Sequence, residues 1–338
     1  MAEPSELLSQ WSVSHGNLRR FFEDRALPPI DEASQRTAGE AAAAAAIEET
    51  FGISIEDFSL GVHSVGGAFA TAGRPHLTQP DPDIPVDVGA AAFFDVDNTL
   101  IQGSSLILLA EELAKRRFIS IRELLPAVVK QLRYRISGSE NADDIAEGRE
   151  QALAIVRGKS VAELQELCRD IVDRHMLTKA YQDTIELGAM HIAAGQQVWL
   201  VSATPVQIGQ ALAERLGFTG ALGTVAEEED GVFTGRLVGD ILHGPGKKHA
   251  VAALAAIQQL DLGKCTAYSD SVNDLPMLEM VGEPIAVNPD RKLRQHAKAR
   301  GWAIRDYRSM RRVTRSYALP ALAVAALGAG AFALNRRR

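Results

Sequence analysis

Short apolar runs alternate with longer helical stretches over the second half of the chain. Brief apolar runs bounded by turn-forming residues are typical of buried strands, and six segments show this pattern: residues 90–95, 197–201, 221–225, 265–268, 284–287 and 302–305. Helical spacing of apolar residues recurs between them, over residues 181–194, 206–216, 247–260, 273–281 and 291–300. Asp230-Gly231 lies between two extended runs and predicts a hairpin. The alternation predicts an α/β fold whose mostly parallel sheet is covered by helices on both faces.

A helical block interrupts this alternation directly after the first strand. Residues 105–176 contain four stretches with helical spacing, over residues 106–117, 121–136, 142–156 and 161–175. Ser160, with Glu163 three residues later, predicts the N-terminal cap of the last one. We therefore expect an all-helical cap, residues 105–176, inserted into a catalytic core formed by residues 89–104 and 177–306.

The N-terminal part has a different composition. Helices are predicted for residues 7–24 and for the alanine-rich stretch 37–50, but large apolar residues are too few for a separate core. The proline-rich stretch 73–87 predicts an extended linker. We interpret residues 1–88 as a partly disordered N-terminal extension, and its first residues lack the pattern of a signal peptide.

The C-terminal part contains 17 uncharged residues, Ala318–Leu334, within the segment 317–335. A membrane-spanning helix usually needs about 20 apolar residues. Two interpretations stay open, a transmembrane helix and a helix packed on the domain or at an interface. Residues 305–316 carry five arginines against three after the apolar stretch, so an anchored chain would keep its catalytic domain in the cytoplasm.

Overall charge and cysteine content exclude several classes of function. The net charge of −7 over 338 residues argues against nucleic acid as the main partner. Cys168 and Cys265 form neither a metal-binding spacing nor a disulfide framework. A cytoplasmic protein with a small anionic ligand fits this composition, and the oligomeric state is left open.

Polar side chains follow the predicted strands at one edge of the sheet. Taken singly, each has an ordinary interpretation as a turn, a helix cap, a solvated lysine or a first-turn acid: Asp95 and Asp97, Ser202, Lys247, Asp270 and Asp274. Carboxylates that converge on one edge repel each other unless a cation lies between them. Oxygen ligands without a His or Cys cluster favour Mg²⁺ as the cofactor.

In this order, the motifs resemble those of the haloacid dehalogenase superfamily. The resemblance rests on Asp95-Val96-Asp97-Asn98-Thr99, Ser202, Lys247 and Ser269-Asp270-Ser271-Val272-Asn273-Asp274. The helical cap, and Thr234-Gly235 ahead of Gly246-Lys247, are similar to its phosphoserine-phosphatase-like branch, subfamily IB. Over residues 90–306 the resemblance implies a Rossmann-like core, a C1-type helical cap and a Mg²⁺-dependent phosphatase.

The chemistry of phosphate ester hydrolysis and the resemblance assign the same roles. Asp95 is the expected nucleophile, which forms a covalent aspartyl-phosphate, and Asp97 is the expected general acid and base. Mg²⁺ is expected to bind Asp95, Asp270 and the backbone carbonyl of Asp97. Asp274 is expected to orient the metal site without binding the ion directly. Ser202 and Lys247 are the expected phosphate-binding side chains. The resemblance implies that Asn273 also faces the phosphate, and the backbone amides of Val96 and Ala203 are further expected donors.

The substrate is less constrained than the reaction. The phosphoserine phosphatases carry a glutamate nine residues after the nucleophile, where this chain has Ser104. Their carboxylate-binding arginine has no secure counterpart, and Arg149 and Arg157 are nearby candidates. We expect a small phosphate monoester, or a lipid phosphate if the C-terminal segment contacts a membrane. The alternatives are phosphoserine itself, phosphotransfer to an alcohol, and an inert membrane-tethered regulator.

Overall fold

A seven-stranded sheet forms the centre of the molecule. The computed structural model describes residues 32–71, 87, 89–116 and 156–307. The strand order is β4-β3-β2-β1-β5-β6-β7, and only β4 is antiparallel to its neighbour. The strands are β1 (Ala91–Phe94), β2 (Gln197–Pro205), β3 (Gly220–Glu229), β4 (Val232–Val238), β5 (Thr266–Ser269), β6 (Glu283–Val287) and β7 (Ala303–Arg305). The expected mostly parallel α/β fold is confirmed.

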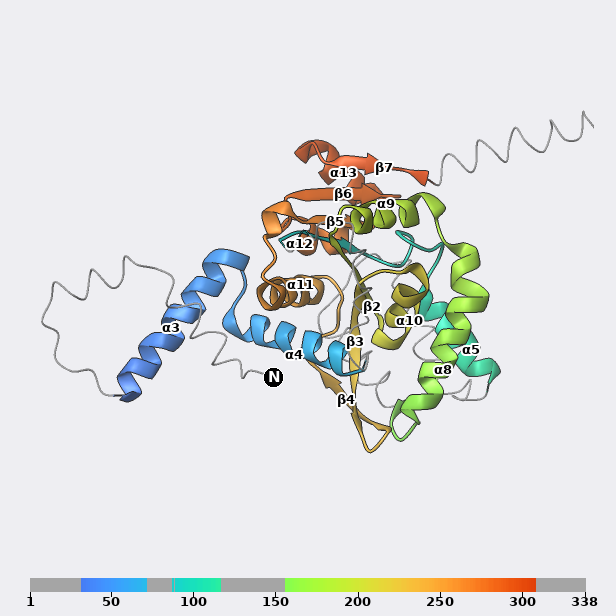
Figure 1. Cartoon of the computed structure of the whole chain (residues 1–338), viewed down its shortest axis with the longest axis horizontal. Helices are drawn as coiled ribbons and strands as arrows, with labels where there is room; N and C mark the ends of the chain where they lie inside the picture. The colour runs from blue at the N-terminus through green and yellow to red at the C-terminus, as the bar shows by residue number, and fades with distance from the viewer. Residues whose placement is uncertain (1–31, 72–86, 88, 117–155, 308–338) are drawn as a thin grey trace, which may run out of the picture.

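Helices connect the parallel strands and cover both faces of the sheet (Figure 1). They are α9 (Gln182–Ala193), α10 (Val206–Leu216), α11 (Pro245–Gln258), α12 (Leu275–Leu278) and α13 (Arg291–Arg300). α10 and α13 have the predicted bounds, and each ends at a glycine with positive φ, Gly217 and Gly301. The single helix predicted over 273–281 is wrong. A 3-10 turn at Val272–Asp274 precedes the four-residue α12, because Ser271 caps the turn and the chain must bend into β6.

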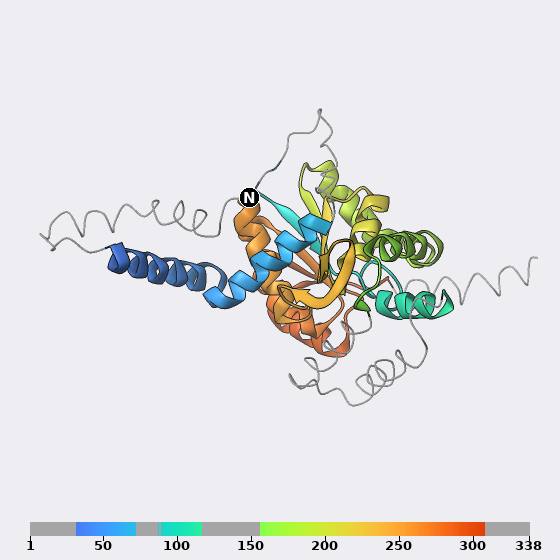
Figure 2. The same ribbon diagram turned by 90° about the horizontal axis from the view of Figure 1, so that it is seen from below.

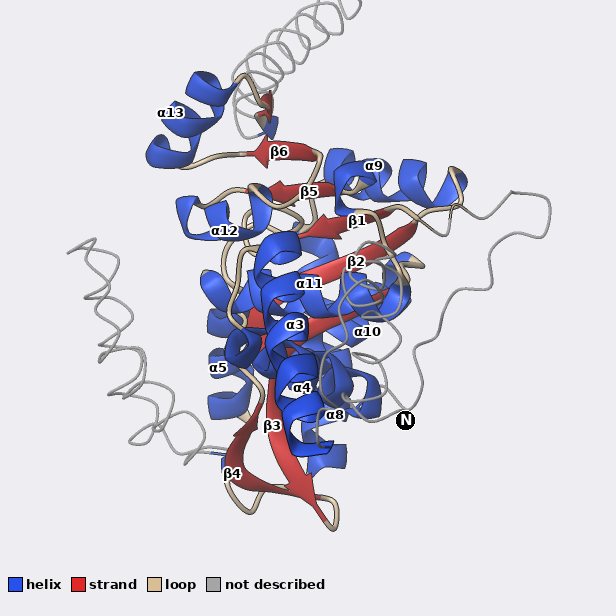
Figure 3. Cartoon of the chain, turned by 90° about the vertical axis from the view of Figure 1, so that its left-hand side faces the viewer, coloured by secondary structure: helices blue, strands red, loops and turns tan. Residues whose placement is uncertain are grey.

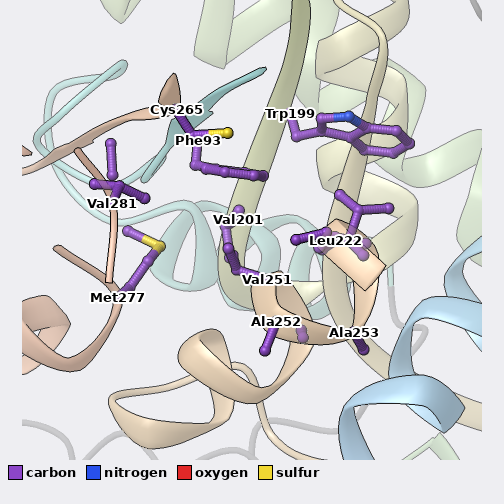
Figure 4. Close-up of a cluster of buried hydrophobic side chains, with 14 of the residues drawn as sticks. Phe93, Trp199, Val201, Leu222, Val251, Ala252, Ala253, Cys265, Met277 and Val281 are labelled. Atoms are coloured by element: carbon purple, nitrogen blue, oxygen red, sulfur yellow. The ribbon is translucent and has the colours of Figure 1, made fainter. Parts of the chain in front are cut away.

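Successive residues of each strand contribute to opposite cores. Phe93 packs with Trp199 and Val201 on the face covered by α11, whereas Phe94 packs on the other face, against Tyr268 at a ring distance of 4.2 Å. Figure 4 shows the first of these cores, where β1, β2 and β3 side chains meet the alanine-rich middle of α11. Burial on both faces explains why these strands are continuously apolar.

Two helices of the cap segment are described, α5 (Ser105–Lys115) and α8 (Val161–Ile171). The Ser160 side chain accepts a hydrogen bond from the Glu163 amide, as predicted. A π-helical turn (Val172–Met176) and a 3-10 turn (Leu177–Lys179) follow α8. The helices predicted over 121–136 and 142–156 lie almost wholly outside the described residues, so the extent of the cap stays a prediction.

Backbone hydrogen bonds tie the cap segment to the core at two places. Where the chain enters and leaves the segment, Tyr181 N–H donates to Leu100 O (2.8 Å) and Gln102 N–H donates to Lys179 O (2.9 Å). Beyond this paired ribbon, the β3–β4 hairpin pairs with residues 158–161 through three bonds of 2.7–3.0 Å. α8 is thereby fixed to the core through its N-terminal end.

One helix of the N-terminal extension is part of the core packing. α3 (Glu32–Phe51) includes the predicted helix 37–50 and projects away from the sheet, whereas α4 (Ile55–Thr71) lies on α11 and β3 (Figure 2). Val65 and Ala68 of α4 are fully buried in the core of that face. No helix was predicted over residues 55–71, so the packing of α4 on the core was missed. The predicted helix 7–24 lies outside the described residues.

No helix within the described ranges is long and apolar enough to cross a membrane. The predicted C-terminal segment 318–334 lies outside these ranges, so its two interpretations stay open.

The packing of α4 on α11 predicts opposite effects for two glycine substitutions in one helix. A Cβ on Gly61 would lie 2.2 Å from the His249 carbonyl oxygen, whereas a Cβ on Gly66 would meet no atom within 4 Å. We expect Gly61→Ala to lower the free energy of unfolding by about 1–3 kcal/mol, and Gly66→Ala to raise it by about 0.5–1 kcal/mol. Urea denaturation of both variants tests this, and equal effects would contradict close packing at Gly61.

Candidate active site

The register of the parallel strands brings the predicted residues to one edge of the sheet. Phe94 of β1 is paired with Leu200 of β2 and with Tyr268 of β5. The next residue, Asp95, donates its backbone N–H to the Tyr268 carbonyl at 2.9 Å. Ser202 and Asp270 lie one step further along the neighbouring strands. The carboxyl edge is where open α/β sheets bind their ligands.

Lys247 joins two of the predicted carboxylates in a buried cluster. Its Nζ lies 2.5 Å from Asp95 Oδ1 and 2.7 Å from Asp274 Oδ2, and all three side chains are less than a tenth exposed. Lys247 lies in the first turn of α11, and the preceding Gly246 permits the turn because a Cβ there would lie 2.0 Å from the Ile241 carbonyl oxygen. The cluster therefore depends on where α11 begins.

Two hydroxyl groups complete the hydrogen bonding of these carboxylates. Thr99 Oγ1 donates to Asp95 Oδ2 (3.1 Å), and Ser269 Oγ donates to Asp274 Oδ2 (2.7 Å). No role was predicted for either hydroxyl, although both residues belong to the quoted motifs. In the sequence, the only indication of such a role was that both residues belong to the same motifs as the carboxylates.

The cluster shifts the pKa of its members. Burial raises the pKa of Asp95 to about 7, against the opposing effect of the Lys247 ammonium and with help from the Asp274 and Asp97 carboxylates. Burial alone would lower the pKa of Lys247, but the attraction of Asp274 and Asp95 outweighs it and raises that pKa. Lys247 therefore stays charged at neutral pH, and Asp95 is close to its ionisation midpoint.

Asp97 is held at the N-terminus of α5, apart from this cluster. Its Oδ1 accepts hydrogen bonds from the Ser105 N–H (2.9 Å) and the Ser105 hydroxyl. The loop between them turns at Asn98, whose φ is 56° and whose Oδ1 accepts from Gly103 N–H. The cap segment thus fixes the orientation of the Asp97 carboxyl.

The fully buried Asn288 is a further site element that sequence reasoning missed. Its Nδ2 donates to the Asn98 carbonyl (3.1 Å) and its Oδ1 accepts from Tyr307 N–H (2.8 Å). It adopts a φ of 48° directly after β6. An asparagine ahead of Pro289 is a turn signal. Its hydrogen-bond partner Asn98 lies 190 residues away in the chain, so the contact could not be predicted.

The remaining predicted residues lie at the end of β2, in the turn after β5 and directly after Asp95. Ser202 is buried and its hydroxyl is 2.8 Å from the Thr204 hydroxyl, while Ala203 between them is exposed. No hydrogen bond joins Ser202 to the Lys247 cluster within the described residues. The Asp270 carbonyl accepts a hydrogen bond from Asp290 N–H. Asn273, three residues later, lies near Gly244, because a Cβ on that glycine would be 3.6 Å from the Asn273 carbonyl oxygen. The buried Val96 is beside Asp95.

The candidate metal ligands at this edge of the sheet are oxygen atoms. No group of three His, Cys, Asp or Glu side chains suited to a metal occurs in the described part of the chain. The predicted set instead combines the Asp95 and Asp270 carboxylates with a main-chain carbonyl, all of them oxygen donors. Lys247 is the one cation bonded to the two buried carboxylates of the cluster in the described residues, so negative charge is left over. This chemistry suits Mg²⁺.

Comparison with known proteins agrees with this geometry. The sequence pattern of the family described as haloacid dehalogenase-like hydrolase matches residues 92–279, which include Asp95, Ser202, Lys247 and Asp274. This chain belongs to the haloacid dehalogenase-like hydrolase family. The predicted superfamily is thereby confirmed, and so is the expectation of an enzyme that is a hydrolase.

Relatives within the family include proteins named as phosphatases. Phosphoserine phosphatase SerB1 of Mycobacterium tuberculosis is 52% identical over 258 residues, which cover 76% of this chain and 84% of that protein. Histidinol-phosphatase of Neisseria meningitidis is 31% identical and covers 64% of this chain and 98% of its own. A crystal structure of a Bordetella pertussis protein of unknown function superposes with a TM-score of 0.58 at 31% identity, covering 64% of this chain and 98% of its own.

The raised pKa of Asp95 predicts a specific pH dependence of stability. Between pH 4 and pH 7 the folded protein holds a proton on Asp95 that the unfolded chain, with its ordinary pKa of 3.8, has released. This group therefore lowers the free energy of unfolding as pH rises through that window, by at most about 1.4 kcal/mol per pH unit.

Urea denaturation of the wild type and of Asp95→Asn, with a chelator present, measures this contribution. As pH rises from 4 to 7, we expect the wild type to lose free energy of unfolding relative to Asp95→Asn. A difference that is constant with pH would show that the Asp95 pKa is not raised.

Proposed function

We propose that this protein is a Mg²⁺-dependent phosphatase that hydrolyses a small phosphate monoester through a covalent aspartyl-phosphate on Asp95. The observation that carries the proposal is the buried contact of Lys247 with Asp95 and Asp274 at the carboxyl edge of the sheet. A cation that holds a nucleophilic carboxylate can also attract the phosphate dianion that this carboxylate must attack. The family and its phosphatase-named members support the same reaction class.

In this proposal, Asp95 is the nucleophile. Thr99 and Lys247 each hold one of its carboxylate oxygens, which fixes the direction of attack on phosphorus. The Lys247 ammonium also favours the ionised form that attack requires. A bond forms from an Asp95 oxygen to phosphorus as the ester oxygen leaves, and water later attacks the acyl phosphate to release inorganic phosphate.

Asp97 is the proposed general acid and base. Ser105 holds Oδ1, whereas Oδ2 makes no hydrogen bond within the described residues. In its protonated form, Asp97 donates a proton to the departing alkoxide, and the resulting carboxylate then accepts a proton from the attacking water.

The other residues bind phosphate and metal. Lys247, Ser202, Asn273 and the amides of Val96 and Ala203 are proposed to hold the phosphate oxygens that do not leave. Asp95, Asp270 and the Asp97 carbonyl would hold Mg²⁺, which offsets the charge of the phosphate when bound. Asp274 supports the site indirectly, through Lys247 and Ser269.

The substrate is proposed to be the phosphate ester of a small alcohol. A relative at 52% identity is named a phosphoserine phosphatase, which makes phosphoserine the first compound to test. Ser104 argues the other way, since a hydroxyl cannot form an ion pair with the ammonium of phosphoserine. Its side chain makes no capping hydrogen bond at the start of α5. A comparison of phosphoserine with histidinol phosphate and glycerol phosphate, by kcat/KM, decides between these substrates.

Substitution of the two aspartates should affect two kinds of substrate differently. Asp95→Asn removes the nucleophile and should abolish turnover of every phosphate ester. Asp97→Asn should slow hydrolysis of an alkyl phosphate by about 10²–10⁴-fold. The same variant should slow formation of the aspartyl-phosphate from 4-nitrophenyl phosphate much less, because nitrophenolate leaves without a proton.

Rapid-quench measurement of nitrophenolate and phosphate release separates these steps. Asp261→Asn, at an exposed loop of the same sheet, serves as the matched control. Full activity of Asp95→Asn would refute the proposed mechanism. A new phosphoester formed in the presence of glycerol would favour phosphotransfer, and the absence of any turnover with Mg²⁺ would favour the inert regulator.

Removal of divalent cations should abolish activity, and Mg²⁺ should restore it. We expect Asp270→Asn to raise the Mg²⁺ concentration for half-maximal activity by about 10–100-fold, because it removes a charged ligand. A titration of the variant and of Asp261→Asn with Mg²⁺ tests this. An unchanged Mg²⁺ requirement in Asp270→Asn would exclude this residue from the metal site.

A further inference from the structure

Helix α13 presents a strongly basic surface at the outer end of the sheet. It lies beyond β6 and is followed by the short edge strand β7 (Figures 1 and 3). Leu293 and Ala297 are fully buried against the core, so the helix has one apolar face toward the sheet. Its other positions carry five Lys or Arg residues and no Asp or Glu.

Most of this positive charge is not neutralised. Arg291, Lys292 and Lys298 are exposed and form no ion pair with another described residue. Arg294 pairs with Asp306, and Arg300 Nη2 lies 3.6 Å from Glu279 Oε1. The exposed Arg305 on β7 extends the basic surface. The chain as a whole is acidic, with a net charge of −7, so this positive charge is local.

The same charge continues along the sequence. Asp306 follows β7, and residues 307–317 after it contain four arginines and no acidic residue. The uncharged stretch Ala318–Leu334 follows them. Basic residues next to an apolar stretch are the pattern by which proteins bind anionic lipid headgroups. A nucleic-acid surface would not need an apolar continuation, and the net charge of the chain opposes it.

The basic surface begins close to the candidate active site. Asp290, the N-terminal cap of α13, accepts a hydrogen bond from Val272 N–H and donates its own N–H to the Asp270 carbonyl. The start of α13 is thus attached to the loop that carries Asp270. A bilayer in contact with α13 would therefore lie beside the carboxyl edge of the sheet.

We propose that the exposed face of α13, continued by Arg305, is a docking surface for a bilayer that contains anionic phospholipid. The basic side chains contact the anionic headgroups. This proposal does not depend on the phosphatase reaction.

Vesicle co-sedimentation of the full chain tests the proposal. We use vesicles of phosphatidylcholine alone and vesicles with one third phosphatidylglycerol, at about 0.1 M salt so that charges are only partly screened. The wild type should bind the phosphatidylglycerol vesicles more tightly. Replacing Arg291, Lys292 and Lys298 together by Gln should weaken this preference on the order of a hundredfold, since each cation near the surface contributes about fivefold.

Matched controls separate the docking surface from a general effect of charge. The triple variant Arg36→Gln, Lys115→Gln, Lys264→Gln has the same net charge but alters exposed cations elsewhere, and should bind like the wild type. Lys298→Gln alone should lose about fivefold, which guards against misfolding of the triple variant. Hydrolysis of soluble 4-nitrophenyl phosphate should be equal in all variants.

Three outcomes would overturn the proposal. The first is equal binding of the wild type to both kinds of vesicle, and the second is unchanged binding of the α13 variants. The third is that a short duplex DNA displaces the wild type from vesicles and that the α13 variants do not bind this DNA. The basic face would then be a nucleic-acid surface.

Discussion

The buried contact between Lys247 and two carboxylates constrains the rest of the catalytic core. Three charged groups removed from water are stable only when their geometry and hydrogen bonds are complete. Thr99 and Ser269 provide the missing hydrogen bonds. The ammonium comes from the first turn of α11, and the carboxylates from the loops after β1 and β5, so these three elements must be positioned together. The closely packed α4 holds α11 from outside, which links the N-terminal extension to the candidate active site.

The same arrangement separates the two aspartates of the first motif. Asp95 is in the buried cluster, where charge and desolvation oppose each other and its pKa rises to about 7. Asp97, two residues later, is outside it and is fixed by the helix that opens the cap segment. A nucleophile and an acid need different surroundings, and one turn of the chain at Asn98 supplies both. The proposed division of roles rests on these contacts: Lys247 and Thr99 hold the two Asp95 oxygens, whereas Ser105 holds one oxygen of Asp97.

Sequence patterns predicted the parallel sheet, the β3–β4 hairpin and the bounds of α10 and α13, because these features depend on local periodicity and turn residues. They also selected Asp95, Lys247 and Asp274, which the structure brings together. They did not predict that α4 joins the core, although Val65 and Ala68 of this helix are buried there. The close contact of Gly61 with α11 carries no hydrophobic signal. The hydrogen bond from Asn288 to Asn98 was equally hidden, because it joins residues far apart in the chain.

The pairing of residues 158–161 with the β3–β4 hairpin has a mechanical consequence. The chain enters and leaves the cap segment through one paired ribbon, which by itself would act as a hinge. The hairpin adds three backbone hydrogen bonds at the far end of α8, and two points of attachment remove the freedom to rotate as a rigid body. α8 therefore belongs mechanically to the core.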